Sequence, residues 1–453
     1  MKIVIVGCGK IGRSILQSLS YENHEITAVD NDSDVIQSIT DTYDVMGICA
    51  SGTHFKTLSD AKVGSADLFI ATTDSDEFNM LSCFLAKRLG ANYTVARIRG
   101  QEYSTENLDF LKQQLEISMI INPELLTAQA INNIIKFPSA AKSEAFTQGR
   151  FEMTEFVVKQ GSVFDGAVLS ELRKKINASF LVCSVLRNET AYIPNGDFVI
   201  REGDRLGVVA ASDDMQKFLK NAGMLQKRSK DIMILGASKI AMYLSYLLTR
   251  NGNNVRIIEK DEERCNEICG ILPKDAEIIC GDGTNHHLLS DEGLDRADAF
   301  VALTGMDEEN ILCAYYAELQ EVPKVIAKVN QGGHSSICEK LGLNCIVSPK
   351  RITADLVTQY ARALQNTMGS KVETLYRLMN GTVEALEFDV SQDFKHLNIA
   401  LKDLKIKPDI IIAGIIRGEK TIIPNGLDVI MPHDKVIVIA AGQKLYDLSD
   451  VIL

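Results

Sequence analysis

The stretch that decides the fold is Lys2-Ile3-Val4-Ile5-Val6-Gly7-Cys8-Gly9-Lys10-Ile11-Gly12, in which an apolar run leads directly into three spaced glycines. The run has the composition of a buried strand, and the residues after it place apolar side chains at helical spacing: Ile11, Ile15, Leu16 and Leu19. In a G-x-G-x-x-G turn between strand and helix, the first glycine turns the chain, the second lets a pyrophosphate approach, and the third allows close packing. The stretch therefore predicts a Rossmann-like domain whose first ligand contacts are Gly7, Cys8, Gly9, Lys10, Ile11 and Gly12.

An acidic residue in the expected place strengthens this interpretation. Asp30 follows the apolar residues 26–29, about 20 positions after the turn, where such folds hold the ribose hydroxyls. A carboxylate there accepts hydrogen bonds from the hydroxyls and repels a 2′-phosphate, so NAD or an adenosine nucleotide is preferred over NADP. The alternative is that the glycines only shape a turn in a Rossmann-like domain that binds nothing.

Further candidate residues stand at the carboxyl ends of three more predicted strands. They are Ser51, Gly52 and Thr53 after the third, Thr73 and Asp74 after the fourth, and Arg97 at the end of the fifth. Ligands of open α/β sheets bind at the carboxyl ends of strands, so all six are candidate contacts. Thr73 and Asp74 could equally cap the next helix, and Arg97 could belong to a solvated surface pair.

The sequence consists of two tandem repeats that together span the whole chain. Ile193-Pro194-Asn195-Gly196 recurs as Ile423-Pro424-Asn425-Gly426, a shift of 230 positions, and matches near both ends of the repeat keep almost the same shift. Each repeat begins with alternating apolar runs and amphipathic stretches and ends with β-rich segments separated by turns such as Pro194-Asn195-Gly196, where Asn and Gly permit positive φ. The predicted fold class is α/β: two tandem repeats, each a Rossmann-like doubly wound parallel-sheet domain followed by a small β-rich α+β domain. The predicted domains are 1–138, 139–226, 227–366 and 367–453.

The second glycine turn is degenerate. It keeps Gly236 but has Ser238 and Ala241 in place of the other two glycines, and a Cβ at Ser238 is expected to crowd a pyrophosphate. Glu259 still supplies the acidic partner, and Asp282 lies in a polar loop after the third strand of the repeat. We therefore expect a second site at Gly236, Glu259 and Asp282 that binds a nucleotide more weakly, differently or not at all.

Composition narrows the functional classes. The 453 residues carry 48 Lys and Arg against 60 Asp and Glu, a net charge of −12, which disfavours nucleic-acid binding. No apolar run has the roughly 20 residues of a membrane span, and no signal peptide is visible, so a cytoplasmic location is expected. None of the ten cysteines forms a C-x-x-C pair, and Cys265 and Cys269 lack a second pair of ligands, so we expect mostly reduced core cysteines and no metal site.

No recognisable set of catalytic residues accompanies the nucleotide motifs. The seven histidines lie in polar stretches without partners at a readable spacing, and no Walker lysine, nucleophile elbow or H-E-x-x-H motif is present. A nucleotide that binds without visible chemistry suggests a signal, so the chain is expected not to be an enzyme. The competing class is an NAD-dependent dehydrogenase with its substrate pocket between domains.

These residues carry a resemblance to a known family. The turn from Gly7 to Gly12 with Asp30, the stretch Ala71-Thr72-Thr73-Asp74-Ser75-Asp76-Glu77, Ala96-Arg97-Ile98-Arg99 and the duplicated plan together resemble the TrkA family, over the full length of the chain. This family comprises the peripheral NAD-binding subunits of Trk-type potassium-uptake systems, built from two tandem RCK units. Cys8 stands where a small apolar residue is usual in the family.

The resemblance implies a regulator that self-associates, as a dimer or tetramer, into a ring beneath a potassium-translocating integral membrane subunit, TrkH-like or TrkG-like. It would lie on the cytoplasmic face of the plasma membrane through that partner. NAD(H), ATP or ADP would bias the shape of the ring and gate the pore. The implied NAD contacts are the turn from Gly7 to Ile11, Asp30, Thr73, Asp74 and Arg97. An RCK-type regulator of another channel or antiporter shares every one of these features.

Overall fold

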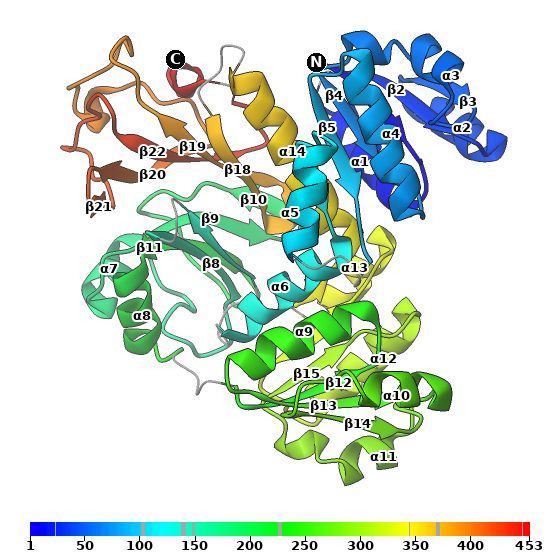
Figure 1. Ribbon diagram of the computed structural model, residues 1–453. Helices are drawn as coiled ribbons and strands as arrows, with labels where there is room; N and C mark the ends of the chain where they lie inside the picture. Colours follow the sequence, from blue (N-terminus) through cyan, green and yellow to red (C-terminus); the bar gives the residue numbers. More distant parts are fainter. Residues whose placement is uncertain are drawn as a thin grey trace.

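The structure is a computed structural model that describes residues 1–22, 24–100, 105–136, 142–146, 150–224, 229–343, 345–367, 372–445 and 447–453. It contains two parallel six-stranded sheets and two antiparallel five-stranded sheets, in alternation along the chain (Figure 1). The predicted fold class is thereby confirmed.

The first parallel sheet has the strand order β3-β2-β1-β4-β5-β6. The strand order changes direction between β1 and β4, so the carboxyl end of β1, where the glycine turn begins, lies in the middle of the sheet. The strands are β1 (Lys2–Val6), β2 (Glu25–Asp30), β3 (Met46–Cys49), β4 (Leu68–Ala71), β5 (Tyr93–Arg97) and β6 (Met119–Ile121). The helices are α1 (Lys10–Ser20), α2 (Ser33–Thr40), α3 (Phe55–Asp60), α4 (Asp76–Leu89), α5 (Thr105–Gln114) and α6 (Pro123–Lys136).

The second parallel sheet repeats this order as β14-β13-β12-β15-β16-β17. Its strands are β12 (Asp231–Leu235), β13 (Asn254–Glu259), β14 (Ala276–Cys280), β15 (Ala299–Ala302), β16 (Val325–Lys328) and β17 (Ile346–Val347). Its helices are α9 (Lys239–Arg250), α10 (Glu262–Cys269), α11 (His286–Asp291), α12 (Asp307–Leu319), α13 (Gly332–Lys340) and α14 (Pro349–Thr367).

The small domains each hold one antiparallel sheet. The first comprises β7 (Lys142–Phe146), β8 (Phe151–Val157), α7 (Leu169–Ile176), β9 (Leu181–Arg187), β10 (Thr190–Tyr192), β11 (Arg205–Ala211) and α8 (Ser212–Asn221). The second comprises β18 (Val372–Leu378), β19 (Val383–Asp389), β20 (Ile410–Arg417), β21 (Lys420–Ile422) and β22 (Lys435–Ala441). Side chains from both sheets share one buried apolar cluster that includes Phe151, Met153, Ala413 and Ile437, so the two small domains pack against each other within the chain.

The turn predicted at Pro194-Asn195-Gly196 forms one residue later, and without positive φ at Asn195 or Gly196. The Phe198 amide donates to the Asn195 carbonyl at 3.2 Å, and the Asn195 side chain accepts from the Asp197 amide at 3.2 Å. Asn195 therefore opens the turn through its side chain, a role for which asparagine is suited, rather than through a left-handed backbone. Asn425 does the same in the second repeat, accepting from Leu427 at 2.9 Å.

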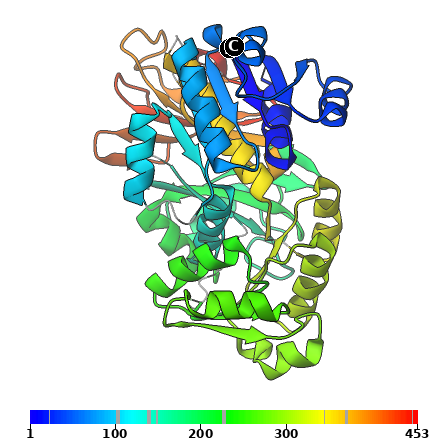
Figure 2. The ribbon, with the colours of Figure 1, turned by 45° about the vertical axis from the view of Figure 1, so that its right-hand side comes forward.

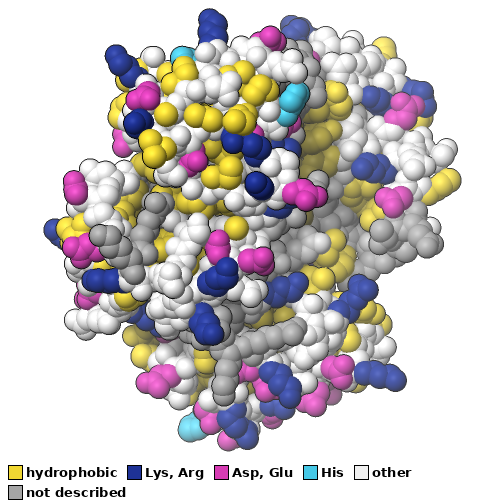
Figure 3. Space-filling model, turned by 90° about the vertical axis from the view of Figure 1, so that its left-hand side faces the viewer, with side chains coloured by type: hydrophobic (Ala, Val, Ile, Leu, Met, Phe, Trp, Pro, Cys, Tyr) yellow, Lys and Arg dark blue, Asp and Glu magenta, His cyan; other side chains and the backbone are white. Residues whose placement is uncertain are grey.

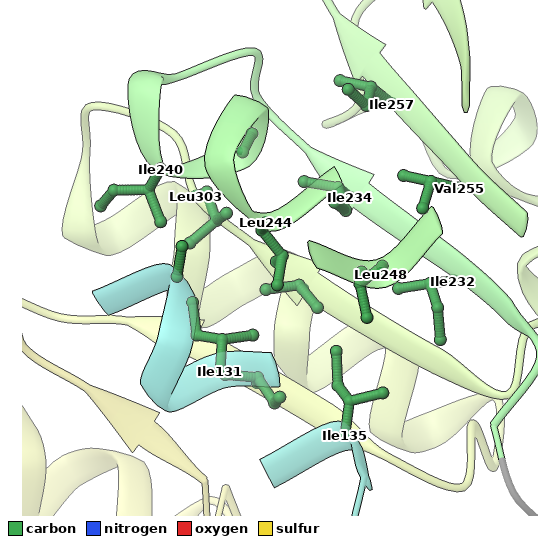
Figure 4. Packing of buried hydrophobic residues seen from close by; sticks show 14 of the residues in the cluster. Ile131, Ile135, Ile232, Ile234, Ile240, Leu244, Leu248, Val255, Ile257 and Leu303 are labelled. Atoms are coloured by element: carbon green, nitrogen blue, oxygen red, sulfur yellow. The ribbon is translucent and has the colours of Figure 1, made fainter. Parts of the chain in front are cut away.

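The helix after each sixth strand packs on the other repeat. Figure 4 shows Ile131 and Ile135 of α6 facing Leu244 and Leu248 of α9, inside the core of the second parallel sheet. In return α14 contributes a buried row of apolar side chains to the core of the first parallel sheet, beside α1: Ala354, Val357, Ala361 and Leu364. In Figures 1 and 2 α14 lies between that sheet and the second small domain.

This exchange qualifies the predicted domain boundaries, which stay predictions. The boundaries 138/139 and 226/227 involve positions outside the described residues, and 366/367 falls in the last turn of α14. Although α6 lies within 1–138 and α14 within 227–366, each completes the core of the opposite Rossmann-like domain. The two repeats are therefore interlocked, because each contributes a helix to the core of the other, and they are not independent units joined by a linker.

Candidate nucleotide site

The first glycine turn uses two of its glycines for packing. Gly7 has φ +83°, and a Cβ built there would lie 2.6 Å from the Thr73 nitrogen. A Cβ at Gly12 would lie 2.0 Å from the Gly7 carbonyl oxygen, which also accepts a hydrogen bond from the Thr72 hydroxyl at 2.7 Å. A side chain at either position would force strand and helix apart.

Gly9 serves a different purpose. Apart from its two chain neighbours, no heavy atom of the described residues lies within 4 Å of where its Cβ would stand, so the space above the backbone is open. Gly9 is also the N-cap of α1, with no side-chain hydrogen bond to the first turn and no acidic residue in that turn. Helix N-terminal amides that lack a protein acceptor, at the positive end of the helix dipole, form an anion site that a pyrophosphate can approach closely.

Asp30 stands beside this turn at the end of β2. Its carboxylate accepts hydrogen bonds from the Cys8 amide at 2.6 Å and the Asp32 amide at 3.1 Å. Two carboxylate oxygens offer about four acceptor positions, so Asp30 can hold the turn and still accept from ribose hydroxyls. The Cys8 side chain faces the core, where burial and Asp30 raise the pKa of its thiol to about 12. Cys8 thus offers a ligand only its backbone.

The other predicted contacts also divide into residues that pack in the core and residues that remain accessible. Ile11 is buried in the core of the sheet, whereas the Lys10 side chain is exposed. Gly52 packs against β1, since a Cβ there would meet the Val6 side chain at 2.2 Å. Ser51 and Thr53 share a hydrogen bond of 3.1 Å between their hydroxyl oxygens and are half-buried beside it.

Thr73 and Asp74 follow β4, and of the two only Thr73 is held in place by a buried side chain. The Thr73 amide and hydroxyl donate to the Asn79 side chain at 2.8 and 2.7 Å. Asp74 does not cap α4 as its position suggested, because Ser75 is the N-cap and accepts from the Phe78 amide at 3.1 Å. The exposed Asp74 carboxylate instead accepts from Arg97 at 3.3 Å.

Arg97 is a buried, incompletely satisfied cation near the turn. It is 8% exposed, and its Nε has no hydrogen-bond partner among the described residues. Burial and the neighbouring Arg99 guanidinium lower the pKa of Arg97. A buried guanidinium with a donor to spare is stabilised by an anion, and a phosphate group supplies acceptors of the right geometry. Arg97 is therefore not a solvated surface residue.

Sequence reasoning missed the residue that ties these strand ends together. Asn79 is fully buried, binds Thr73 and donates to the Arg97 carbonyl at 2.9 Å. Asn310 makes the same contacts with Thr304 and the Lys328 carbonyl in the second repeat. The only signal was its recurrence at equivalent positions, because a buried asparagine in a helix has no spacing rule that reveals its partners.

The second cleft keeps the scaffold of the first. Gly236 has φ +89°, and Glu259 accepts from the Ala237 amide at 2.7 Å and the Asp261 amide at 3.0 Å, as Asp30 does in the first repeat. Asp282 is exposed, and the amide and hydroxyl of Thr284 lower the pKa of its carboxyl group. The acidic partner and the polar loop are therefore both in place.

The phosphate end of the second cleft differs. Ser238 caps α9 by accepting a hydrogen bond from the Ala241 amide at 3.3 Å, whereas no side chain of the described residues accepts from the equivalent amide in the first repeat. Lys328 replaces Arg97, and Gly305 replaces Asp74, so the ion pair of the first cleft has no counterpart there. Burial lowers the pKa of Lys328. The two clefts are thus unequal where phosphates would bind.

A large cavity adjoins the first turn, and Asp30 is not among the residues that line it. Its volume is about 1500 Å³, and it extends from Cys8, Gly9 and Lys10 to Lys350 and Arg351 at the start of α14. The glycine turn of the first repeat therefore faces both its own cleft and a space shared with the other repeat.

The described residues hold neither a membrane-spanning helix nor a cluster of metal ligands. No helix there is both long and apolar enough to cross a membrane, and no group of three or more metal-ligating side chains is gathered there. On the face drawn in Figure 3, basic and acidic side chains of the described residues are interspersed rather than gathered into a basic stripe.

Comparison with known proteins gives two family matches, each repeated. Residues 3–123 and 232–349 match the TrkA-N domain, and residues 153–223 and 387–452 match the TrkA-C domain. A Trk system potassium uptake protein TrkA homolog of Archaeoglobus fulgidus is 30% identical over 451 residues, covering 100% of both chains. The Trk system potassium uptake protein TrkA of Vibrio alginolyticus is 29% identical, covering 100% of this chain and 98% of that protein.

Solved structures share the fold at low sequence identity. The GsuK RCK domain superposes with a TM-score of 0.63 at 16% identity, covering 97% of this chain and 92% of that chain. The GsuK channel bound to NAD gives 0.61 at 16% identity, covering 97% and 77%. GsuK bound to ADP gives 0.50 at 15% identity, covering 81% and 69%.

Proposed function

The chain belongs to the TrkA family, and from this premise we propose that it is a nucleotide-sensing regulatory subunit of a potassium-uptake system. The observation that carries the proposal is the first cleft: an open backbone at Gly9, an acidic partner at Asp30 and a buried guanidinium at Arg97 with a donor to spare. Together they fit the phosphates and the ribose of one adenosine nucleotide.

NAD(H) and ADP or ATP are the ligands that we propose. The carboxylate of Asp30 favours free ribose hydroxyls over a 2′-phosphate, so NADP should bind poorly. Two solved relatives in fold are described as bound to NAD and to ADP, which supports the same ligand class for this chain. The contacts would be the turn from Gly7 to Gly12, with Asp30, Ser51, Gly52, Thr53, Thr73, Asp74 and Arg97 around it.

The second cleft would bind a nucleotide less tightly. It has the acidic partner Glu259, but its first-turn amides are partly taken by Ser238 and its cation is a lysine. Gly236, Glu259 and Asp282 would be its contacts. Two unequal sites would let one chain respond to two ranges of nucleotide concentration.

A continuous set of contacts leads from the first cleft to the second small domain. The glycine turn opens α1, α1 packs on α14, and Arg362 of α14 binds Glu384 of β19 at 3.0 Å. A nucleotide that binds one arrangement of these elements more tightly than another would shift the equilibrium between them, typically by about 1–3 kcal/mol. We propose that this shift is the regulatory output and that the chain catalyses no reaction.

The output requires a partner in the membrane. We propose a potassium-translocating integral subunit, TrkH-like or TrkG-like, with this chain peripheral to it on the cytoplasmic face as part of a dimeric or tetrameric ring. Leu81 of α4 and Leu312 of α12, equivalent positions of the two repeats, are 49% and 67% exposed, and such repeated apolar side chains suit an assembly surface.

Replacing Asp30 by Ala tests the ligand site. Loss of a charged acceptor for ribose hydroxyls should weaken NAD and ADP binding by about 1–3 kcal/mol, which is about 5-fold to 150-fold in Kd. Isothermal titration calorimetry of the full chain measures it, with Glu259→Ala as the matched control because it alters the same position of the second cleft. Unchanged affinity in Asp30→Ala would remove that residue from the site, and absence of binding by the unaltered chain would refute the nucleotide role.

Replacing Gly9 by Ser separates ligand binding from folding. The new side chain enters open space and creates the N-cap that Ser238 has in the second repeat, so the free energy of unfolding should change by no more than about 0.5 kcal/mol. Because the side chain occupies the pyrophosphate approach, nucleotide affinity should fall about tenfold or more. Parallel thermal melts and calorimetric titrations check both. A stable variant with undiminished affinity would show that no phosphate approaches Gly9.

A further inference from the structure

Two cysteines lie together on the ribose side of the second cleft. The pairing of β13 with β14 places Cys280 directly opposite Glu259. From the other side, Cys265 in α10 donates its thiol hydrogen to the Glu259 carbonyl, with 3.5 Å between sulfur and oxygen. Helix α10 also packs on β14 itself, and the Cys280 thiol contributes to the raised pKa of the Cys265 thiol. Strand pairing and the packing of α10 therefore place both cysteines beside Glu259, independently of either side chain's titration.

The first repeat has half of this arrangement. Its strand pairing places Cys49 opposite Asp30, as Cys280 is opposite Glu259. The position equivalent to Cys265 is Ile36, which is buried against the sheet. The thiol pair is therefore a property of the second cleft alone, and the first cleft supplies a single exposed cysteine in the same backbone setting.

The two thiols differ in access. Cys280 is exposed, whereas Cys265 is 6% exposed. Burial, the Cys280 thiol and the carboxylates of Glu259 and Asp261 raise the pKa of Cys265 to about 11. An oxidant from solution therefore meets Cys280 first, and Cys265 is placed to react second, as the residue that resolves the first product.

We propose that Cys265 and Cys280 are a site of reversible oxidation, at which a peroxide converts the two thiols into one disulfide. The Cys280 sulfur attacks one oxygen of hydrogen peroxide, the O–O bond breaks, and water leaves to give a sulfenic acid. The Cys265 sulfur then attacks the Cys280 sulfur, the S–O bond breaks, and the hydroxide leaves as water with the Cys265 proton. Two electrons pass from the thiols to the peroxide, which ends as two molecules of water.

The bond would join the first half of α10 to the end of β14, one on each side of Glu259. It would therefore fix the two segments that frame the acidic partner of the second cleft. The first cleft would keep its freedom under the same conditions, because Ile36 cannot form the bond.

The test is peptide mapping of the full-length protein after treatment with hydrogen peroxide under native conditions, alkylation of the remaining thiols and digestion without reductant. We expect a peptide that links residues 265 and 280, a fall of two in the number of alkylated thiols, and full reversal by dithiothreitol. Cys280→Ser, at an exposed position, should abolish the linked peptide without affecting folding, and Cys265→Ser should abolish it as well. Cys269→Ser, one helical turn further on, and Cys49→Ser are the matched controls and should retain it.

Two results would overturn the proposal. One is a link from Cys280 to Cys269 or to another cysteine in place of Cys265. The other is oxidation of Cys280 to a sulfinic acid with Cys265 still alkylated. Neither depends on nucleotide binding, so the thiol pair and the proposed regulatory function can fail separately.

Discussion

Replacing Arg362 by Met is expected to lower the free energy of unfolding by about 3–5 kcal/mol. The Arg362 side chain is 3% exposed and binds Glu22 through two hydrogen bonds of 2.7 Å, while two more of 3.0 Å reach Glu384. Burial lowers the pKa of this guanidinium, but its two carboxylate partners raise it above the ordinary value overall. Methionine fills a similar volume and leaves the buried carboxylate of Glu22 and the partly buried carboxylate of Glu384 without their main counter-charge.

Urea and thermal unfolding followed by circular dichroism measure this effect. Arg88→Met is the control, since Arg88 and Glu116 form a 3.0 Å pair in which the side chains are 59% and 47% exposed, and removing it should cost less than about 1 kcal/mol. Combining Arg362→Met with Glu22→Gln and Glu384→Gln should recover much of the loss, because no buried charge is then left alone. Equal effects at Arg362 and Arg88 would contradict the buried cluster.

Replacing Ile131 by Ala should destabilise the chain by about 2–5 kcal/mol, the usual range for a cavity in a packed core. Ile131 is fully buried, and it packs from α6 against the core of the second parallel sheet rather than the first (Figure 4). The reciprocal change Val357→Ala in α14 should destabilise the core of the first sheet, where Val357 is fully buried.

Hydrogen exchange followed by mass spectrometry gives the sharper readout. Ile131→Ala should increase exchange in α9 and β12 more than in α1 and β1, because the cavity opens in the second repeat. Ile271→Ala is the control, since Ile271 is 51% exposed and its truncation should change stability by no more than about 0.5 kcal/mol. Faster hydrogen exchange confined to the first sheet would contradict the packing of α6 in the core of the opposite repeat.

The elements of each repeat could be predicted from local pattern. The run at residues 3–6 became β1 (Lys2–Val6), and the apolar spacing of Ile11, Ile15 and Leu19 became the buried face of α1. Both signals are local, because an alternation or a helical stripe shows which side of an element is buried. Hydrophobic spacing does not show which sheet covers that side, so the transfer of α6 and α14 to the opposite repeats could not be foreseen.

The candidate site was predictable where backbone geometry dictates the residue type, as at Gly7, Gly12 and Asp30. It was not predictable where a partner comes from far along the chain. Arg362 and Glu22 are 340 positions apart, and Cys265 and Cys280 both lie beside Glu259 only because α10 packs there and β13 pairs with β14. Thr73 and Asp74 were the plausible caps in the sequence, whereas the structure assigns that role to Ser75.

The most direct test of the proposed function is potassium uptake at limiting external potassium in cells that lack this chain, complemented with the wild type or with Asp30→Ala at equal protein levels. The proposed function predicts that uptake is lost without the chain, restored by the wild type and not restored by Asp30→Ala. Normal uptake without the chain, or equal restoration by both forms, would contradict nucleotide-controlled regulation of potassium uptake.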